Sequence, residues 1–215
     1  FFLESFATPP PEIILDVDAT DDPVHGKQEG RFFHGYYDRY CYLPLYVFCG
    51  DHLLLARLRA GNHDPAKGAV EELERIVSRI HARWPRTRII VRGDSGFCRE
   101  EIMSWCEDSR YPLHYVLGLA RNDRLLELIG DAACEATLRF EQTGTKARGI
   151  DGFQDDTEDS WSRARRVIAR VELDERGLND RYVVTSLAQA RYGDVRVYEK
   201  IYCARGDMEN RIKEQ

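Results

Sequence analysis

Apolar positions along this chain fall into short aliphatic runs and one helical stripe. Three almost continuous runs are typical of strands buried on both faces, at residues 12–20, 88–94 and 113–120. The stretch 35–49 is rich in Tyr, Val and Leu and predicts a further strand, which turns at Gly50-Asp51 into a strand over 52–59. Its aromatic residues could stack on bases, but a continuous apolar run favours core packing.

Helical periodicity separates these strands. Apolar residues recur at steps of three and four from Ala69 to Trp84, and Asp64 followed by Pro65 predicts the N-cap and first turn of that helix. Two further helices are predicted at 99–108 and 122–140, and Gly130 is a candidate break in the second. A hairpin followed by strand–helix units predicts a mixed α/β sheet with flanking helices.

The last third of the chain has a different pattern of polar and apolar residues. Residues 141–160 are polar and predict a long loop, whereas 165–173 and 181–188 alternate as strands around a polar turn. Residues 194–204 predict another extended segment, and Asp207 is expected to cap a final helix that runs to the chain end.

Composition adds limits to this picture. The 215 residues are 43% hydrophobic and 32% charged, which is typical of a globular protein with enough apolar material for a core. The net charge of −6 argues against a simple electrostatic nucleic-acid binder, although 83–92 and 163–170 are basic and 151–160 is acidic. No apolar run reaches membrane-spanning length, and no secretory signal begins the chain, whose first residues, FFLESF, read as the middle of a longer protein. The six cysteines form no C-x-x-C pair, so we expect buried thiols and a cytoplasmic protein.

Carboxylates follow two of the predicted buried strands. Alternation places Asp16 and Asp18 on one face of the first strand, and Asp94 comes just past the second, flanked by Gly93 and Gly96. Acids at the ends of neighbouring strands supply the hard oxygen ligands that Mg²⁺ or Mn²⁺ prefers. The competing interpretation is that Asp18 starts an Asx-turn and that Asp94 caps the following helix.

A third acid is available from the final helix. Glu209 lies in its predicted first turn, where the helix dipole favours an anion. Arg205, four residues earlier, could pair with Glu209 or with a phosphate. The alternative interpretation is a surface helix whose first turn carries a capping acid, because it would show the same residues at the same positions.

Four segments, in this order, resemble the catalytic domain of bacterial insertion-sequence transposases of the DDE class, and in particular the 1380 group of the insertion-sequence-four-like superfamily. They are DVDATDD with a following HG, YCYLPLYVFCGDHLL, RGDSGFCRE and YCARGDMENRIKE. The resemblance runs from about residue 12 to the end of the chain. It implies a ribonuclease H-like fold with a β-rich insertion between the second Asp and the Glu.

On this resemblance the catalytic and metal-binding acids are Asp18, Asp94 and Glu209. Asp18 precedes the Ala-Thr pair of the family pattern, and Glu209 ends a Y-x-x-R-x-x-x-E motif that begins with Tyr202 and includes Arg205. Asp16 is expected to be a supporting or neutralised neighbour. The implied domains are a catalytic core over 1–140, an insertion over 141–193 and a return to the core over 194–215.

The resemblance also implies partners and chemistry. Two Mg²⁺ or Mn²⁺ ions would support cleavage of transposon-end DNA and strand transfer into target DNA, and the full-length protein would act as a dimer on double-stranded DNA near the nucleoid. Trp161 is the candidate for holding a flipped base, with packing in the strand hairpin as the alternative. Salt-sensitive backbone contacts are expected from a set of arginines: Arg163, Arg165, Arg166, Arg170 and Arg205.

Some family features fall outside these 215 residues. The family motif continues to a lysine about one residue beyond Gln215, and a separate N-terminal DNA-binding region precedes the catalytic domain in the family. We therefore expect this stretch of chain not to transpose alone.

Two other functions fit part of the sequence. LDVDAT resembles the D-x-D-x-T motif of haloacid-dehalogenase-like phosphatases, in which Asp16 would be the covalent nucleophile, Asp18 the acid/base and Asp94 a Mg²⁺ ligand. That fold follows its first strand with a helical unit, whereas a tyrosine-rich hairpin is predicted here. The second is an inactive, transposase-derived DNA-binding fragment, although all three acids are present.

Overall fold

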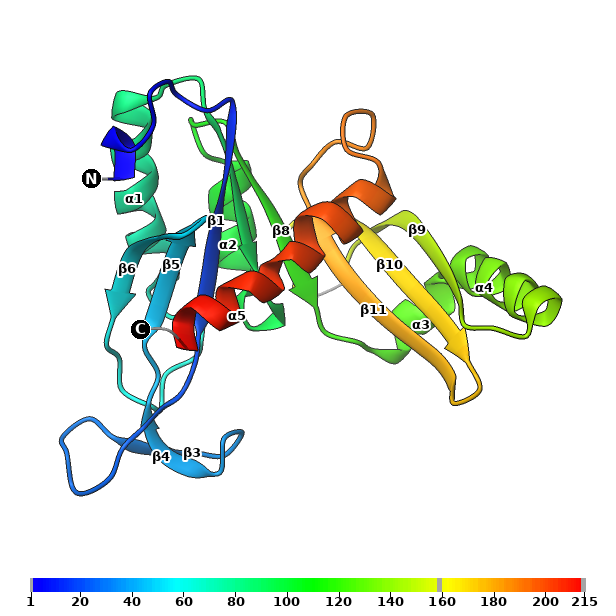
Figure 1. The fold of residues 1–215 in the computed structure, drawn as a ribbon, viewed down its shortest axis with the longest axis horizontal. Coiled ribbons are helices and arrows are strands. Elements are labelled where there is room, and N and C mark those ends of the chain that lie inside the picture. The colour runs from blue at the N-terminus through cyan, green and yellow to red at the C-terminus, as the bar shows by residue number, and fades with distance from the viewer. Residues whose placement is uncertain (1, 158–159, 214–215) are drawn as a thin grey trace. The chain divides into compact units, whose positions relative to one another are not determined.

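The computed structural model describes residues 2–157 and 160–213, and of Asp207, Glu209, Asn210 and Lys213 it describes the backbone alone. The chain forms two compact units, one of Phe1–His114 with Arg205–Gln215 and one of Tyr115–Ala204, each with its own strands and helices (Figure 1). The functional division at 140 and 193 predicted from the sequence stays a prediction. Over the described residues, none of the helices combines the length and apolar character needed to cross a bilayer.

The first unit is built on a mixed sheet. Its strand order is β6-β5-β1-β7, and the strands are β1 (Glu12–Ala19), β5 (Leu45–Cys49), β6 (His52–Arg57) and β7 (Arg88–Gly93). β1 is antiparallel to β5 and parallel to β7, which confirms the mixed sheet predicted from the element order. Leu15 and Val17 point to the core from one face of β1 and are fully buried.

The helices α1 (Ala69–Arg83) and α2 (Glu100–Glu107) belong to this unit (Figure 1). α1 buries Leu73, Val77 and Ile80, the stripe expected from the sequence, and α2 follows the short 3₁₀ helix Ser95–Phe97. The predicted N-cap at Asp64 is wrong. Gly68 caps α1 with φ of 74°, a left-handed conformation that glycine adopts easily, while Asp64 accepts a hydrogen bond from the Ala66 amide (2.8 Å) and caps only the preceding turn.

The predicted strand over 35–49 is also wrong in its first half. A separate small sheet, of order β2-β4-β3, contains β2 (Asp22–Pro23), β3 (Phe32–His34) and β4 (Arg39–Tyr42). Residues 35–38 turn the chain between β3 and β4, where the Tyr37 amide donates to the His34 carbonyl (3.2 Å) and Asp38 has φ of 51°. Gly35 and Asp38 are turn-forming residues, and they interrupt an aromatic run that otherwise reads as one strand.

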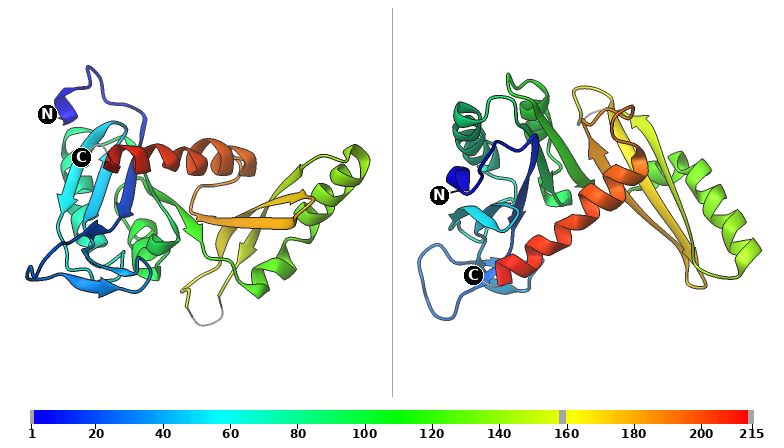
Figure 2. Two further views of the ribbon diagram at one scale, coloured as in Figure 1. Left: turned by 60° about the horizontal axis from the view of Figure 1, so that its bottom comes forward. Right: turned by 45° about the horizontal axis from the view of Figure 1, so that its top comes forward.

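The second unit is an antiparallel sheet with helices. Its strand order is β8-β11-β10-β9, and the strands are β8 (Leu113–Leu119), which the chain enters from the first unit, β9 (Ala147–Asp155), β10 (Arg165–Asp174) and β11 (Gly177–Thr185). The helix predicted over 122–140 is broken as expected, into α3 (Asp123–Leu128) and α4 (Gly130–Thr143). α4 packs along β9 and β10 (Figure 2).

Two segments of this unit differ from the prediction. The polar stretch 141–160 contains the nine-residue strand β9, because Ala147 and Gly149 turn toward α4 and the exposed Arg148 pairs with Glu172 of β10 at 2.7 Å. Residues 194–204 are helical instead of extended, with a π-helix over Arg196–Tyr202 and a 3₁₀ turn over Cys203–Arg205.

The spacing of buried residues explains the second difference. Val197, Tyr198 and Ile201 are buried at helical steps, whereas Val195 is 54% exposed. α5 (Gly206–Lys213) follows directly, so position 207 is not the start of a helix as predicted.

The close approach of α4 and β9 makes a testable packing prediction. A Cβ at Gly149 would lie 2.2 Å from the Ala132 carbonyl oxygen, whereas a Cβ at Gly130 would meet nothing within 4 Å. We expect Gly149→Ala to lower the free energy of unfolding by about 1–3 kcal/mol through overpacking. Gly130→Ala, the matched control in the same helix–strand pair, should not destabilise. Urea denaturation measures both, and equal stability of the two variants would contradict this packing.

Candidate active site

The register of β1 and β7 sets two acids of β1 beside arginines of β7. Residues 12–16 of β1 each pair with the residue 76 positions later, so Glu12 lies opposite Arg88 and Asp16 opposite Arg92. Asp18 lies further along β1, and Asp94 comes directly after the last residue of β7. The acids of the first two levels thus have arginine partners, whereas Asp18 and Asp94 lie at or just past the ends of their strands.

Asp18 and Asp94 are each held by a backbone amide. The Ala19 amide donates to Asp18 Oδ1 and the Gly96 amide to Asp94 Oδ1, both at 2.8 Å. Asp94 therefore caps the 3₁₀ helix Ser95–Phe97, as one interpretation of the sequence expected of it for the following helix. Arg205 Nη1 lies 3.7 Å from Asp18 Oδ2, a loose ion pair. A backbone amide thus fixes the Oδ1 atom of each carboxylate.

A cavity of about 340 Å³ brings these acids together within the first unit. Asp18 and Asp94 line it with Arg205, and the remaining lining residues are Ala19, Thr20, Tyr36, Tyr37 and Ile212. Burial, together with the negative charges of Asp21, Asp18 and Asp94, raises the pKa of Tyr37 to about 12. The Tyr37 hydroxyl is therefore protonated at neutral pH and is available as a hydrogen-bond donor. The cavity is acidic, with one arginine.

Asp16 differs from Asp18 in its surroundings. Its two carboxylate oxygens accept hydrogen bonds from Arg92, one from Nε and one from Nη2 at 2.7 Å, and both side chains are buried. Asp16 is not among the residues that line the acidic cavity. In a bidentate pair of this kind the two charges compensate each other, and the carboxylate serves the structure of the sheet.

The third candidate acid is located only by its backbone. Glu209 belongs to α5, in the same unit as Asp18 and Asp94, but its side chain lies outside the described part of the structure. Tyr202 ends the π-helix of the second unit, half-buried, with its ring 5.9 Å from the Tyr198 ring. The sequence motif that links these residues thus crosses the boundary between the units.

The arginines predicted to bind DNA differ in accessibility. Arg163 is exposed, whereas Arg165 is buried and its guanidinium lies 5.5 Å from the centre of the half-buried Trp161 ring. Arg166 is buried and donates to the Leu187 and Tyr192 carbonyls and to Asp194. Arg170 pairs with Glu172 at 3.1 Å. Arg166 and Arg170 therefore hold the second unit together, which does not favour the predicted role in phosphate contacts.

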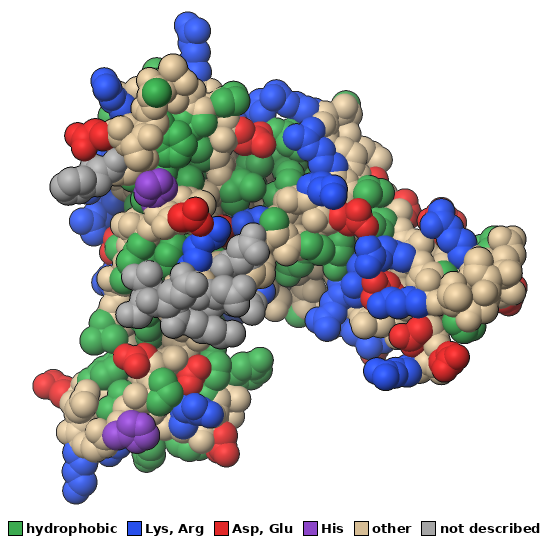
Figure 3. All heavy atoms as spheres, in the orientation of Figure 1, with side chains coloured by type: hydrophobic (Ala, Val, Ile, Leu, Met, Phe, Trp, Pro, Cys, Tyr) green, Lys and Arg blue, Asp and Glu red, His purple; other side chains and the backbone are tan. Residues whose placement is uncertain are grey.

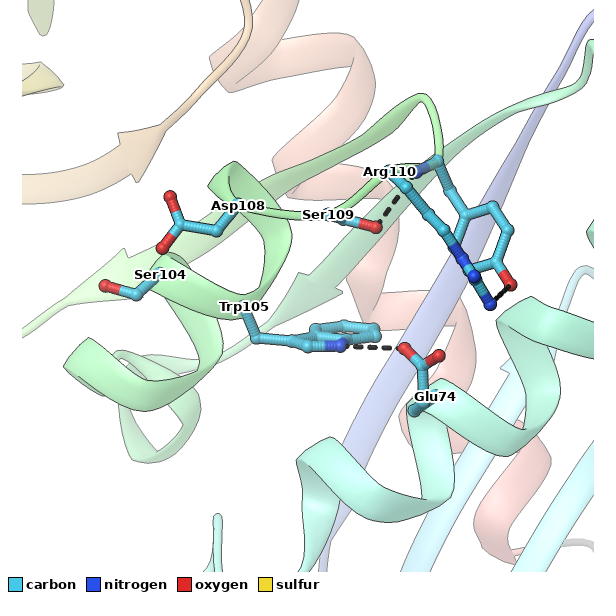
Figure 4. A pocket seen from close by; sticks show the side chains of 7 residues that line it. Glu74, Ser104, Trp105, Asp108, Ser109 and Arg110 are labelled. Atoms are coloured by element: carbon cyan, nitrogen blue, oxygen red, sulfur yellow. Dashed lines mark hydrogen bonds between the residues drawn. The ribbon is translucent and has the colours of Figure 1, made fainter.

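A second cavity, of about 390 Å³, lies at the surface of α1 and α2 in the first unit (Figure 4). Trp105 Nε1 donates to Glu74 at 2.9 Å, and Arg110 donates to the Tyr111 hydroxyl. The polar groups along its wall thus pair with one another. It contains none of the acids predicted to act in catalysis, so the cavity lined by Asp18 and Asp94 is the stronger candidate.

Sequence reasoning missed Tyr36 and Tyr37 as residues of the acidic cavity. Both were assigned to a core strand, whereas the structure places them in the β3–β4 turn. Their sequence context, Gly35-Tyr36-Tyr37-Asp38, contained the signal, because glycine and aspartate flanking a pair of aromatic residues are typical of a turn.

The donor chemistry of the cavity suits a hard divalent cation. Two carboxylates from adjacent strands provide oxygen ligands, and their mutual repulsion is relieved by a bound cation. Among the described side chains, no three acid, His or Cys residues converge as a metal site, and the side chain of Glu209 is not included in that comparison. Asp18 and Asp94 thus fit as two ligands of an incomplete set.

Comparison with known proteins finds a matching family model. A family model described as transposase DDE domain group 1 matches residues 1–215. A search of curated proteins finds no match.

Two solved structures show distant likeness. One is a piggyBac transposase in a synaptic complex with hairpin DNA, at 13% identity and a TM-score of 0.47, over 84% of this chain and 34% of that one. The other is the Argonaute of Marinitoga piezophila with guide RNA and target DNA, at 9% identity and a TM-score of 0.36, over 92% of this chain and 26% of that one. The chain thus spans about a third or less of the length of either protein, and neither likeness carries an inference about fold or activity.

Proposed function

The chain belongs to the group 1 family of transposase DDE domains, and from this membership we propose that it is the catalytic part of a cut-and-paste transposase. It would cleave DNA at transposon ends and join those ends to target DNA by metal-dependent phosphoryl transfer. Asp18, Asp94 and Glu209 are the proposed catalytic and metal-binding acids, in a ribonuclease H-like core that carries a β-rich insertion over 141–193. The 1380 group is the proposed subgroup.

The cavity that Asp18 and Asp94 share is the observation that carries this proposal. The register of β1 and β7 places an arginine opposite each of the two preceding acids of β1, Glu12 and Asp16. Asp18 and Asp94 instead line one cavity, where two carboxylates disfavour each other's charge unless a cation binds between them. This arrangement is expected of residues that hold an external cation.

Each residue of the cavity has a proposed part. Asp18 and Asp94 would hold Mg²⁺ or Mn²⁺, which when bound activates an attacking oxygen and stabilises the leaving oxygen of a phosphodiester. Arg205, 3.7 Å from Asp18, would orient that carboxylate in the free protein and contact a DNA phosphate in the complex. Tyr37, kept protonated by its raised pKa, can donate a hydrogen bond to a phosphate oxygen.

The remaining parts of the proposal concern the intact protein. We propose that it binds double-stranded DNA at transposon ends and target, as a dimer, in the bacterial cytoplasm. Trp161 stays the candidate for a flipped base, and Arg163, the exposed arginine of the predicted set around 163–170, stays a candidate for backbone contacts.

The phosphatase alternative is disfavoured by Asp16. A covalent nucleophile needs a carboxylate oxygen directed at substrate. Both oxygens of Asp16 bind the Arg92 guanidinium, and Asp16 does not line the acidic cavity. The inactive-fragment alternative remains open to the experiment that follows.

Metal removal tests the proposal. The full-length protein, incubated with DNA that carries its transposon ends, should nick that DNA in Mg²⁺ or Mn²⁺ and lose the activity in EDTA. Added Mg²⁺ should restore it, and Ca²⁺ should support DNA binding without cleavage. Binding without nicking in either Mg²⁺ or Mn²⁺ would show that the protein is an inactive DNA-binding module.

A further inference from the structure

The β3–β4 hairpin of the first unit presents an unusual number of exposed aromatic rings. Tyr36 is 86% exposed and Phe33 is 53% exposed, and Tyr40 of β4 is about half exposed. In Figure 3, apolar side chains are visible at the surface of the part that contains β3 and β4. Burying such rings is worth about 1.5–3 kcal/mol each, so their exposure forgoes folding stability and indicates another use.

The rings of this hairpin form an ordered set. Phe33 and Tyr40 are cross-strand partners with ring centres 5.6 Å apart, and the Arg31 guanidinium lies 4.5 Å from the centre of the Tyr40 ring. Alternation along β3 therefore places Phe33 on one face of the small sheet and Phe32 on the other, opposite the buried Cys41. Phe33, Tyr40 and Arg31 together make one aromatic face.

Tyr36 connects this hairpin to the acidic cavity. It lies in the turn between β3 and β4, lines the cavity with Asp18 and Asp94, and is held edge-on by the Tyr37 ring at 5.0 Å. His34 supports the same turn through its ring contact with Tyr37 at 4.8 Å. An exposed, laterally fixed ring at the edge of a phosphodiester site is placed to meet the base next to the phosphate that reacts.

We propose that the β3–β4 hairpin binds unpaired nucleobases of the DNA strand that enters the acidic cavity. Tyr36 would stack on the base nearest the reacting phosphate, and Phe33 and Tyr40 on a base further along the strand. The proposal rests on the proposed transposase function, because it takes the cavity to be the site of phosphoryl transfer. It adds a site for single-stranded DNA distinct from Trp161 of the second unit.

The chemistry of the hairpin favours nucleobases over a protein partner. A face of aromatic rings with an arginine over one of them is the arrangement that stacks bases without regard to sequence. Its two strands are three and four residues long, so this face is small beside the surface that a stable protein interface buries. The cation of Arg31 adds charge complementarity to a DNA backbone.

Matched variants on adjacent residues test the proposal. The probes are a single-stranded oligonucleotide that contains 2-aminopurine and the same sequence as a duplex, titrated with the full-length protein in Ca²⁺. Tyr36→Ala and Phe33→Ala should each weaken single-strand binding about 10-fold and change duplex binding less than about 2-fold. Tyr36→Phe, which keeps the ring, and Phe32→Ala, which removes a 42% exposed ring from the opposite face, should bind as the wild type does.

The outcomes separate this proposal from the proposed function. Equal losses for Phe32→Ala and Phe33→Ala, unchanged single-strand binding in Tyr36→Ala, or a change in oligomeric state in place of DNA affinity would each overturn it. If the wild type nicks DNA in Mg²⁺ but Tyr36→Ala binds normally, the hairpin proposal alone fails. If the ring variants lose single-strand binding but the wild type never nicks, the transposase proposal fails and the binding site stands.

Discussion

Asp18→Asn and Asp94→Asn should each reduce DNA cleavage by more than about 100-fold, since even groups that only orient a metal ligand are typically worth 10–100-fold. Asparagine keeps the oxygen that accepts the Ala19 or Gly96 amide, and it removes the negative charge that holds a cation. The loss should appear in single-turnover nicking by the full-length protein, measured over a range of Mn²⁺ concentrations. Higher Mn²⁺ should restore part of the activity if the defect is metal affinity.

Measurements of unfolding free energy distinguish a loss of catalysis from a loss of folding in these variants. The pair of Asp18 with Arg205 is loose, at 3.7 Å, and asparagine at this position would keep the oxygen that accepts the Ala19 amide, so we expect the free energy of unfolding to change by less than about 1 kcal/mol. On the proposed function, Glu209→Gln should resemble the two aspartate variants in activity. Wild-type cleavage by any one of these variants would remove that residue from the site.

Local sequence patterns predicted those elements of the first unit whose apolar residues follow one clear periodicity. The buried strands β1 and β7 and the apolar stripe of α1 follow from aliphatic runs and three- to four-residue steps. The extended segment predicted over 194–204 is wrong, because burial follows Val197, Tyr198 and Ile201 at helical steps. β9 was missed because its buried positions are Ala147, Gly149 and Asp155, which carry little apolar signal; Gly149 makes room for α4.

The candidate site was predictable in its residue types but not in its pairings. Acids after buried strands pointed to Asp18 and Asp94, which the structure brings to one cavity. The register that sets Asp16 opposite Arg92 is a property of two strands 76 residues apart, and no local pattern contains it. The positions of Tyr36 and Tyr37 in the cavity likewise depend on a contact distant in sequence, because the β3–β4 turn lies beside Asp18 and Ala19 of β1.

Breaking the Asp16–Arg92 pair should destabilise the fold far more than breaking the exposed Glu12–Arg88 pair of the same two strands. Both side chains are nearly inaccessible, at 2% and 6% exposure, and the pair is bidentate. Replacing Arg92 leaves the buried Asp16 carboxylate without the guanidinium that binds both of its oxygens, so Arg92→Met should lower the free energy of unfolding by about 3–5 kcal/mol. Glu12–Arg88 is the matched control, since it joins the same strands in the same register but is 21–27% exposed. Glu12→Gln should cost less than about 1 kcal/mol.

The double variant Asp16→Leu/Arg92→Met distinguishes an ion pair from a catalytic acid. Replacing both charges by apolar side chains of similar volume removes the desolvation cost along with the attraction, so the double variant should be more stable than either single variant. Urea denaturation of the wild type, Asp16→Leu, Arg92→Met and the double variant gives the coupling energy directly. Because Asp16 lies outside the acidic cavity, the double variant should also retain Mg²⁺-dependent nicking within about 10-fold. Recovery of stability with complete loss of nicking would instead place Asp16 in the cleavage reaction.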